Sequence, residues 1–152
     1  EAVEPFREMP EVAGPIYEHV VAARPEDARS LVILANAYWL AGRGPDSVGA
    51  LATRAIAADP ANRGAWHLWA LSEPTLRDRV DRWRQVAERF PSDELAKANL
   101  ADNAASLAST ERDREALQVA IHTYRALLRT AKRPEQRNAL ERAVSTLEHW
   151  TL

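Results

Sequence analysis

Residues 55–62 read Ala55-Ile56-Ala57-Ala58-Asp59-Pro60-Ala61-Asn62, and this arrangement recurs along the chain. A run of small and aliphatic residues ends at a proline, and an Asp or Asn stands two positions later. The same pattern occurs at 20–27 and 86–93, and a looser copy closes at Pro134. The intervals between the four prolines are 35, 31 and 43 residues. Recurrence on this scale predicts stacked supersecondary units.

Each junction predicts that one helix ends, the chain turns, and another helix begins. Proline cannot continue a helix, because it lacks the N–H group and its ring clashes with the preceding turn. Asp or Asn accepts hydrogen bonds from the first amides of the following helix. We therefore expect Asp27, Asn62 and Asp93 to cap helices.

Composition agrees with a helical protein. The 152 residues include no cysteine and only five glycines, so disulfides and thiolate metal sites are excluded and helix is favoured almost everywhere. The formal net charge of −2 gives no overall attraction to nucleic acid or to an anionic membrane. The longest apolar stretch, 31–41, is much shorter than the roughly 20 residues that span a bilayer.

Hydrophobic periodicity predicts about seven to eight helices, and residues 1–14 are expected to be an irregular lead-in with a short helix at most. The predicted helices are 15–24, 27–41, 45–58, 62–71, 73–90, 92–108, 111–132 and 134–150, with a break at Ser109 and Thr110. Short turns make successive helices pack antiparallel, which generates an α-solenoid. The units of this single domain, 15–152, are 15–26, 27–61, 62–92, 93–134 and a capping helix, 135–152.

Side-chain size predicts how these helices pack. Small residues allow close approach where two helices of a hairpin cross; they are Ala35, Ala55, Ala70, Ala87, Ala101 and Ala120. Bulky residues are expected to fill the space between successive pairs; they are Tyr17, Trp69, Trp83, Phe90 and Tyr124.

A search for catalytic or metal-binding motifs finds none. The four histidines occur singly, without a partner at metal-ligand spacing, and Gly42-x-Gly44 is explained as a turn. Two acidic pairs, Asp78 with Asp81 and Glu111 with Asp113, resemble an acid and a base, but neighbouring arginines favour solvated ion pairs. We expect no enzymatic activity, no metal and no cofactor.

The densest basic stretch is 77–89, where five arginines surround Trp83. An aromatic side chain among basic residues is one feature of nucleic-acid surfaces. However, four acidic residues in 73–88 nearly cancel this charge, and Trp83 lies on the apolar stripe of its helix. A charged outer face is the favoured interpretation, and no nucleic-acid partner is expected.

Three sets of residues together resemble the repeat motif of the tetratricopeptide family, in degenerate form. They are Leu34-Ala35, Tyr38, Ala52, Ala55 and Pro60; then Trp66, Trp69-Ala70, Val86 and Pro91; then Leu100-Ala101, Ala116, Ala120 and Tyr124. The resemblance covers about residues 15–150 and implies a right-handed α-solenoid of antiparallel helix pairs. The last unit departs from the motif, because helix 111–132 is long and Pro134 comes late.

In that family the first helices of the pairs line a concave groove that holds a peptide. The resemblance places these candidates on the groove: Arg29, Asn36, Trp39, His67, Asn99, Asp102, Asn138 and Arg142. Asn36 is the only polar interruption of the apolar stretch 31–41; its amide either binds a partner's backbone or is satisfied within the fold. A subtype that binds chaperone C-termini uses Lys and Asn where Val32 and Leu68 stand here, so that activity is not implied.

The sequence therefore predicts a non-enzymatic scaffold that binds a peptide or protein segment, as a domain of a larger protein. Two alternatives remain open. Exposed end helices, near Trp150, could stack into a homodimer, or the chain could be the regulatory or substrate-recruiting arm of an attached enzyme. No membrane insertion of this segment is expected, and a cytoplasmic location is favoured.

Overall fold

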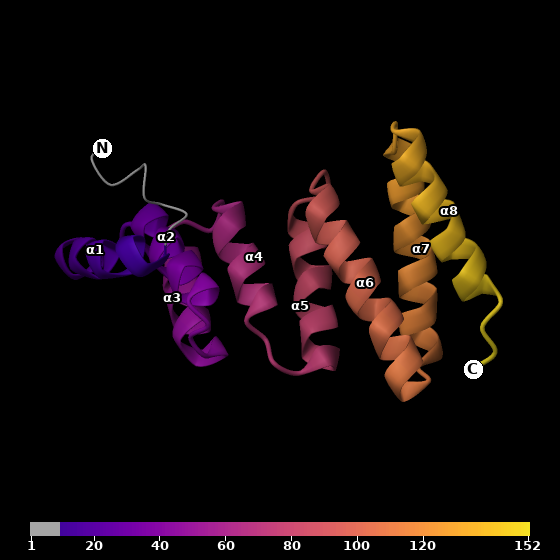
Figure 1. Cartoon of the computed structure of the whole chain (residues 1–152), viewed down its shortest axis with the longest axis horizontal. Coiled ribbons are helices and arrows are strands. Elements are labelled where there is room, and N and C mark those ends of the chain that lie inside the picture. The colour runs from indigo at the N-terminus through magenta and orange to yellow at the C-terminus, as the bar shows by residue number, and fades with distance from the viewer. Residues whose placement is uncertain (1–9) are drawn as a thin grey trace. The chain divides into compact units, whose positions relative to one another are not determined.

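The computed structural model describes residues 10–152, without the side chains of Pro10 and Val12. This range contains eight α-helices and no strand, which confirms the all-α prediction (Figure 1). The helices are α1 (Pro10–Ala23), α2 (Ala28–Leu40), α3 (Pro45–Ala58), α4 (Arg63–Leu71), α5 (Leu76–Arg89), α6 (Glu94–Glu111), α7 (Arg114–Thr130) and α8 (Pro134–Glu148). From α2 onward each end lies within three residues of its predicted position.

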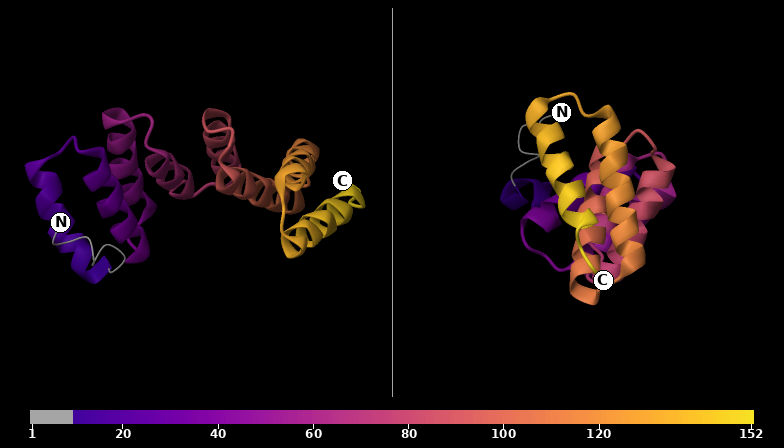
Figure 2. Two further views of the ribbon diagram at one scale, coloured as in Figure 1. Left: turned by 90° about the horizontal axis from the view of Figure 1, so that it is seen from above. Right: turned by 90° about the vertical axis from the view of Figure 1, so that its right-hand side faces the viewer.

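The chain divides into two compact units. Unit 1 is Glu1–Pro74 with α1 to α4, and unit 2 is Thr75–Leu152 with α5 to α8. In unit 1, α2 packs against α1, α3 and α4; in unit 2, α6 packs against α5 and α7, and α7 packs against α8 (Figure 2). The boundary falls inside 62–92, the segment that the proline spacing groups as one repeat.

Polar caps begin several helices as predicted. Asn62 Oδ1 accepts from the Ala65 amide at 3.1 Å, and Asp93 Oδ1 accepts from the Ala96 amide at 3.1 Å. Asp27 precedes α2 with the expected extended backbone, but its carboxylate makes no hydrogen bond to a helix amide. It accepts instead from the Ser30 hydroxyl at 2.6 Å, because that hydroxyl competes for the same oxygens.

Two helix ends differ from the prediction. Helix α1 begins at Pro10, so residues 10–14 of the expected lead-in are helical, whereas residues 1–9 lie outside the described range. An interior proline costs about 3 kcal/mol; Pro15 is nevertheless inside α1, because Ala13 and Tyr17 on either side of it are buried in the core.

The break expected at Ser109 and Thr110 is wrong. Helix α6 continues to Glu111, and Arg112 leaves the helix in the left-handed conformation, with φ 53°. Asp113 then caps α7, accepting from the Ala116 amide at 3.0 Å. Asp and Ser have similar preferences for this capping position, and the negative charge of Asp113 is in addition favoured near the positive end of the helix dipole.

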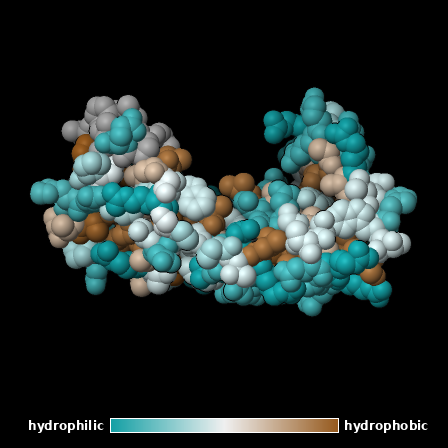
Figure 3. All heavy atoms as spheres, turned by 60° about the horizontal axis from the view of Figure 1, so that its bottom comes forward, coloured by the Kyte–Doolittle hydropathy of each residue, from teal (hydrophilic) through white to brown (hydrophobic). Residues whose placement is uncertain are grey.

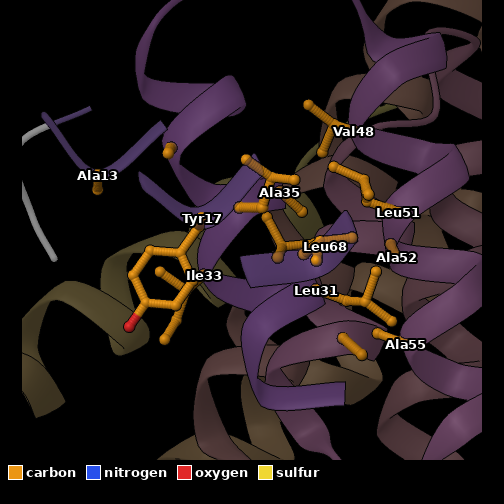
Figure 4. Packing of buried hydrophobic residues seen from close by; sticks show 14 residues of the cluster. Ala13, Tyr17, Leu31, Ile33, Ala35, Val48, Leu51, Ala52, Ala55 and Leu68 are labelled. Atoms are coloured by element: carbon orange, nitrogen blue, oxygen red, sulfur yellow. The ribbon is translucent and has the colours of Figure 1, made fainter. Parts of the chain in front are cut away.

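The core of unit 1 is built on α2. Leu31 and Ala35 are fully buried, and they pack with Tyr17 of α1, Val48 of α3 and other apolar side chains (Figure 4). Trp66 and Trp69 of α4 meet edge to face with ring centroids 5.4 Å apart, as their three-residue spacing predicts. The Trp66 ring nitrogen also donates to the Pro60 carbonyl at 2.8 Å, which ties α4 to the preceding turn.

In unit 2, Trp83 is fully buried and belongs to the core. This burial confirms that Trp83 is a core residue and excludes it as an exposed stacking platform. Five of the six predicted crossing alanines in the two units are 0 % exposed; Ala87 is only half-buried. Hydrophilic and intermediate residues make up most of the face shown in Figure 3, with hydrophobic residues in separate spots.

Candidate functional site

The structure brings two of the predicted groove residues together in unit 1. Asn36 of α2 and His67 of α4 line the same hollow, which has a volume of about 340 Å³. The remaining lining residues are apolar or glycine: Val32, Ile33, Gly64, Leu68 and Leu71. This α2–α4 hollow therefore combines an apolar surface with one amide and one imidazole.

Helical spacing places these side chains on two facing stripes. Val32 and Asn36 are four residues apart on α2, and Leu68 and Leu71 are three apart on α4. Gly64 of α4 lies beside Val32 of α2, because a β-carbon added there would be in van der Waals contact with Cγ1 of Val32, at 3.4 Å. The apolar side chains of Val32 and Leu68 both line this hollow, one from each helix.

The amide of Asn36 makes no hydrogen bond to the part of the chain that the structure describes, although the residue is half-buried. The sequence leaves open whether this amide is satisfied within the fold. Among residues 10–152 no group satisfies it, so its donors and its acceptor remain available in the α2–α4 hollow.

The other two candidates of unit 1 do not line this hollow. Arg29 lies in the first turn of α2 and Trp39 in the last, and both are exposed. Trp39 is 40 % exposed, which makes it one of the few large apolar side chains on the described surface. These residues extend along α2 from either end of the hollow.

The candidates of unit 2 are engaged locally or lie on the outer helix. Asn99 Nδ2 donates to the Leu95 carbonyl at 3.0 Å, and Asp102 Oδ1 accepts from the Tyr124 hydroxyl at 2.5 Å. Burial raises the pKa of Tyr124, and the bond to Asp102 raises it further. The last two candidates, Asn138 and Arg142, are exposed on α8.

Unit 2 contains a larger apolar hollow that the sequence prediction missed. It has a volume of about 480 Å³ and lies among α5, α6 and α7. Leu100 and Thr123 are its buried members, whereas Ala87, Val119 and Ala126 are half-exposed apolar residues. Apolar surface is therefore left uncovered on the side of α5 and α7, the second helices of the predicted pairs.

A smaller hollow of unit 2, of about 290 Å³, continues the larger one along α5 and α7. The two share Arg84 and Glu115, and we call them together the α5–α7 groove. On both helices, the residues that line the smaller hollow come earlier in the sequence, and those that line the larger hollow come later. Helices α5 and α7 therefore run in the same direction on the two sides of the groove, with α6 between them (Figure 1).

The smaller hollow is the acidic end of the α5–α7 groove. Its lining includes Asp78, Asp81, Asp113 and Glu115 against Arg77 and Arg84. Arg77 is bound by Glu111 at 2.9 Å and by Asp113 at 3.0 Å. The hydrogen bond from the Ala116 amide lowers the pKa of Asp113, and the neighbouring Arg77 guanidinium lowers it further.

These contacts decide between the two interpretations of one acidic pair. Glu111 and Asp113 both bind the Arg77 guanidinium, as the ion-pair interpretation predicts. Asp81 accepts from Gln85 Nε2, four residues later on the same exposed face of α5, at 3.0 Å.

The missed groove leaves a weak trace in the sequence. Its α7 side is a stripe of Glu115, Val119, His122 and Ala126 at intervals of three and four residues, beside the apolar stripe that packs on α6. The sequence signal for this groove is that the apolar face of α7 is wider than packing on α6 alone requires. The distance between α5 and α7, however, depends on how α6 packs between them, and the spacing of residues in the sequence does not predict that distance.

Within residues 10–152 no three acidic or histidine side chains gather as a metal site would require. None of the helices in this range combines the length and the apolar character needed to cross a bilayer.

Comparison with known proteins identifies the fold. No protein-family model matches the chain, and no curated protein matches it. Among solved structures, the crystal structure of MamA is similar to it, with a TM-score of 0.61 and 14 % sequence identity over 91 % of this chain and 86 % of that one. MamA is a tetratricopeptide-like solenoid, so the chain has a tetratricopeptide-like helical fold.

Proposed function

We propose that this chain is a non-enzymatic scaffold that binds a segment of a partner protein in the α2–α4 hollow. The observation that carries the proposal is the half-buried Asn36 amide, which has no partner among residues 10–152 and lines an apolar hollow. A bound peptide would supply a backbone N–H and C=O to this amide. One of its apolar side chains would lie against Val32 and Leu68.

The lining favours an internal segment over a chain terminus. Val32 and Leu68 supply no charge or hydrogen bond to a terminal carboxylate, and apolar surface favours an apolar side chain. His67 adds a second polar group that can select among segments. The outlying candidates, Arg29 and Trp39, extend the proposed contact along α2.

The proposal is tested with peptides selected from a random phage-displayed library on the whole chain. Asn36→Ala is expected to weaken a selected peptide by about tenfold, the effect of one lost amide hydrogen-bond pair. Gln85→Ala, which removes an exposed amide outside the hollow, is the matched control. Fluorescence anisotropy measures the affinities, and circular dichroism checks that each variant is folded.

An affinity unchanged by Asn36→Ala would contradict the α2–α4 hollow as the site.

The two alternatives have weaker support. The exposed residues of α8 are mostly polar or charged, and they include Asn138, Glu141 and Arg142. A polar outer face suits a helix that caps a repeat stack. Light scattering at high concentration separates a monomer from a dimer stacked through α8. The role of recruiting arm for an attached enzyme requires the same binding activity.

A further inference from the structure

We infer that the α5–α7 groove of unit 2 is a second docking site, and that its occupant is an amphipathic helix of a partner protein with basic residues in its last turn. The groove is separate from the α2–α4 hollow, because all its lining residues belong to unit 2. The inference therefore goes beyond the proposed peptide site of unit 1.

The lining of the groove favours protein surface as its occupant. Ala87, Val119 and Ala126 are apolar and half-exposed, and the side chains beside them, such as Gln118 and His122, are polar and exposed. An apolar strip between polar side chains is the arrangement that binds the apolar face of an amphipathic helix. The strip borders the acidic hollow at Arg84 and Glu115.

Groove length and backbone chemistry favour a helix over an extended peptide. From Arg77 to Glu88 the α5 wall covers eleven residue steps, or about 16 Å, which equals about three helical turns. The walls are helices whose interior backbone groups are already paired. An extended segment would leave its own N–H and C=O groups unpaired over apolar side chains, whereas a helix satisfies them internally.

Charge and dipole arguments fix the direction of the occupant. Asp78 and Glu115 have no ion-pair partner within the described residues, and Arg77 is already held by Glu111 and Asp113. Asp78 and Glu115 both lie at the acidic end of the groove, where α5 and α7 begin. A helix antiparallel to α5 and α7 places its C-terminal end there, where its dipole favours basic residues that also pair with these carboxylates.

The experiment selects helical peptides of about three turns from a phage-displayed library against the whole chain. The library randomises the apolar face and both terminal turns. Val119→Glu, which places a carboxylate in the apolar strip, serves for counter-selection, and circular dichroism establishes that it folds. We expect enriched peptides to carry Lys or Arg in the last turn and to bind Val119→Glu at least tenfold more weakly.

A charge-reversal variant tests the direction independently of the apolar strip. Asp78→Lys with Glu115→Lys is expected to weaken the enriched peptide by about tenfold or more, because like charges then face each other. Asn36→Ala and Glu141→Lys, which lie outside the groove, should leave binding unchanged.

Four results would overturn the inference. The first three are no enrichment over the Val119→Glu counter-selection, enrichment with no bias for basic residues in the last turn, and equal binding of a proline-containing peptide that cannot form a helix. Loss of peptide binding in Asn36→Ala alone would assign the peptide to the α2–α4 hollow of unit 1, and this fourth result would also overturn the inference.

Discussion

Single residues decide where helices begin and how the candidate sites are charged. Asn62, Asp93 and Asp113 each accept a hydrogen bond from a helix amide, so a side chain of four heavy atoms determines where a whole element starts. The same residue type also balances charge at the α5–α7 groove, because Asp113 both caps α7 and binds Arg77. One acidic residue thus has a structural role and an electrostatic one.

Tyr124 makes the stability of the chain sensitive to alkaline pH. Burial and the bond to Asp102 raise the pKa of Tyr124 above its usual value of about 10. As the pH rises, the unfolded chain therefore loses the Tyr124 proton before the folded chain does. The stabilisation that Tyr124 contributes is complete below about pH 10 and is lost as the pH rises towards the pKa of Tyr124 in the folded chain. Tyr124→Phe is expected to flatten this decline and to lower stability at neutral pH by about 1 kcal/mol.

Urea unfolding at neutral and alkaline pH measures both effects. Tyr38→Phe is the comparison, because burial raises the pKa of Tyr38 as well, and its hydroxyl donates to Glu18 in unit 1. An alkaline decline in Tyr124→Phe as steep as in the unmodified chain would contradict the assignment to Tyr124.

At the scale of elements, long side chains hold neighbouring helices in place. Arg137 Nη1 of α8 donates to the Leu128 and Ala131 carbonyls at the end of α7, both at 2.9 Å. Carbonyls at a helix C-terminus lack helical partners, and a cation is favoured there. Arg137 therefore caps one helix while anchoring the next.

Arg137→Met is expected to loosen α8 selectively. The substitution keeps the apolar stem but removes two charge-assisted hydrogen bonds, at a cost of about 1–2 kcal/mol. Hydrogen exchange should show faster exchange of α8 amides with little change in α6. Arg142→Met on the exposed face of α8 is the matched control, and equal loosening in both variants would refute the capping role.

The packing of elements also explains why α1 begins before Pro15. Local propensity disfavours a proline in a helix, yet Tyr17 and Ala13 are almost completely buried. Burial of a large aromatic side chain contributes a few kcal/mol, enough to offset this cost. Tertiary contacts outweigh the local preference at this position.

At the scale of the whole molecule, the chain consists of two compact units, each with its own buried side chains. Leu31 and Val86 are both 0 % exposed, the first in unit 1 and the second in unit 2. In helical-repeat folds each element contacts its neighbours in sequence, so stability is local.

Leu31→Ala is expected to destabilise unit 1 by about 2–5 kcal/mol and to leave α6 and α7 protected. Val86→Ala should have the reverse pattern, with the loss confined to unit 2. Hydrogen exchange resolved by residue distinguishes the two. An equal loss of protection in both units from either substitution would show that they unfold as one cooperative body.

The sequence alone determined the helices, because their signals are local. Proline and glycine stop a helix, Asp and Asn begin one, and apolar spacing of three and four residues marks the packing face. These signals predicted α2 to α8 within three residues at each end, the burial of Trp83 and the pairing of Trp66 with Trp69. They missed Asp113 as a cap because Ser109 and Thr110 are cap residues of similar preference.

Only the tertiary structure decided which side chains share a surface. It places Asn36 and His67 in one hollow although 31 residues separate them, and it leaves Asn99 and Asp102 bonded within unit 2. It also reveals the α5–α7 groove, formed by two helices that are not adjacent in sequence. The physical reason is that hydrogen-bond caps act within a few residues, whereas a groove depends on distances between helices set by the packing of a third.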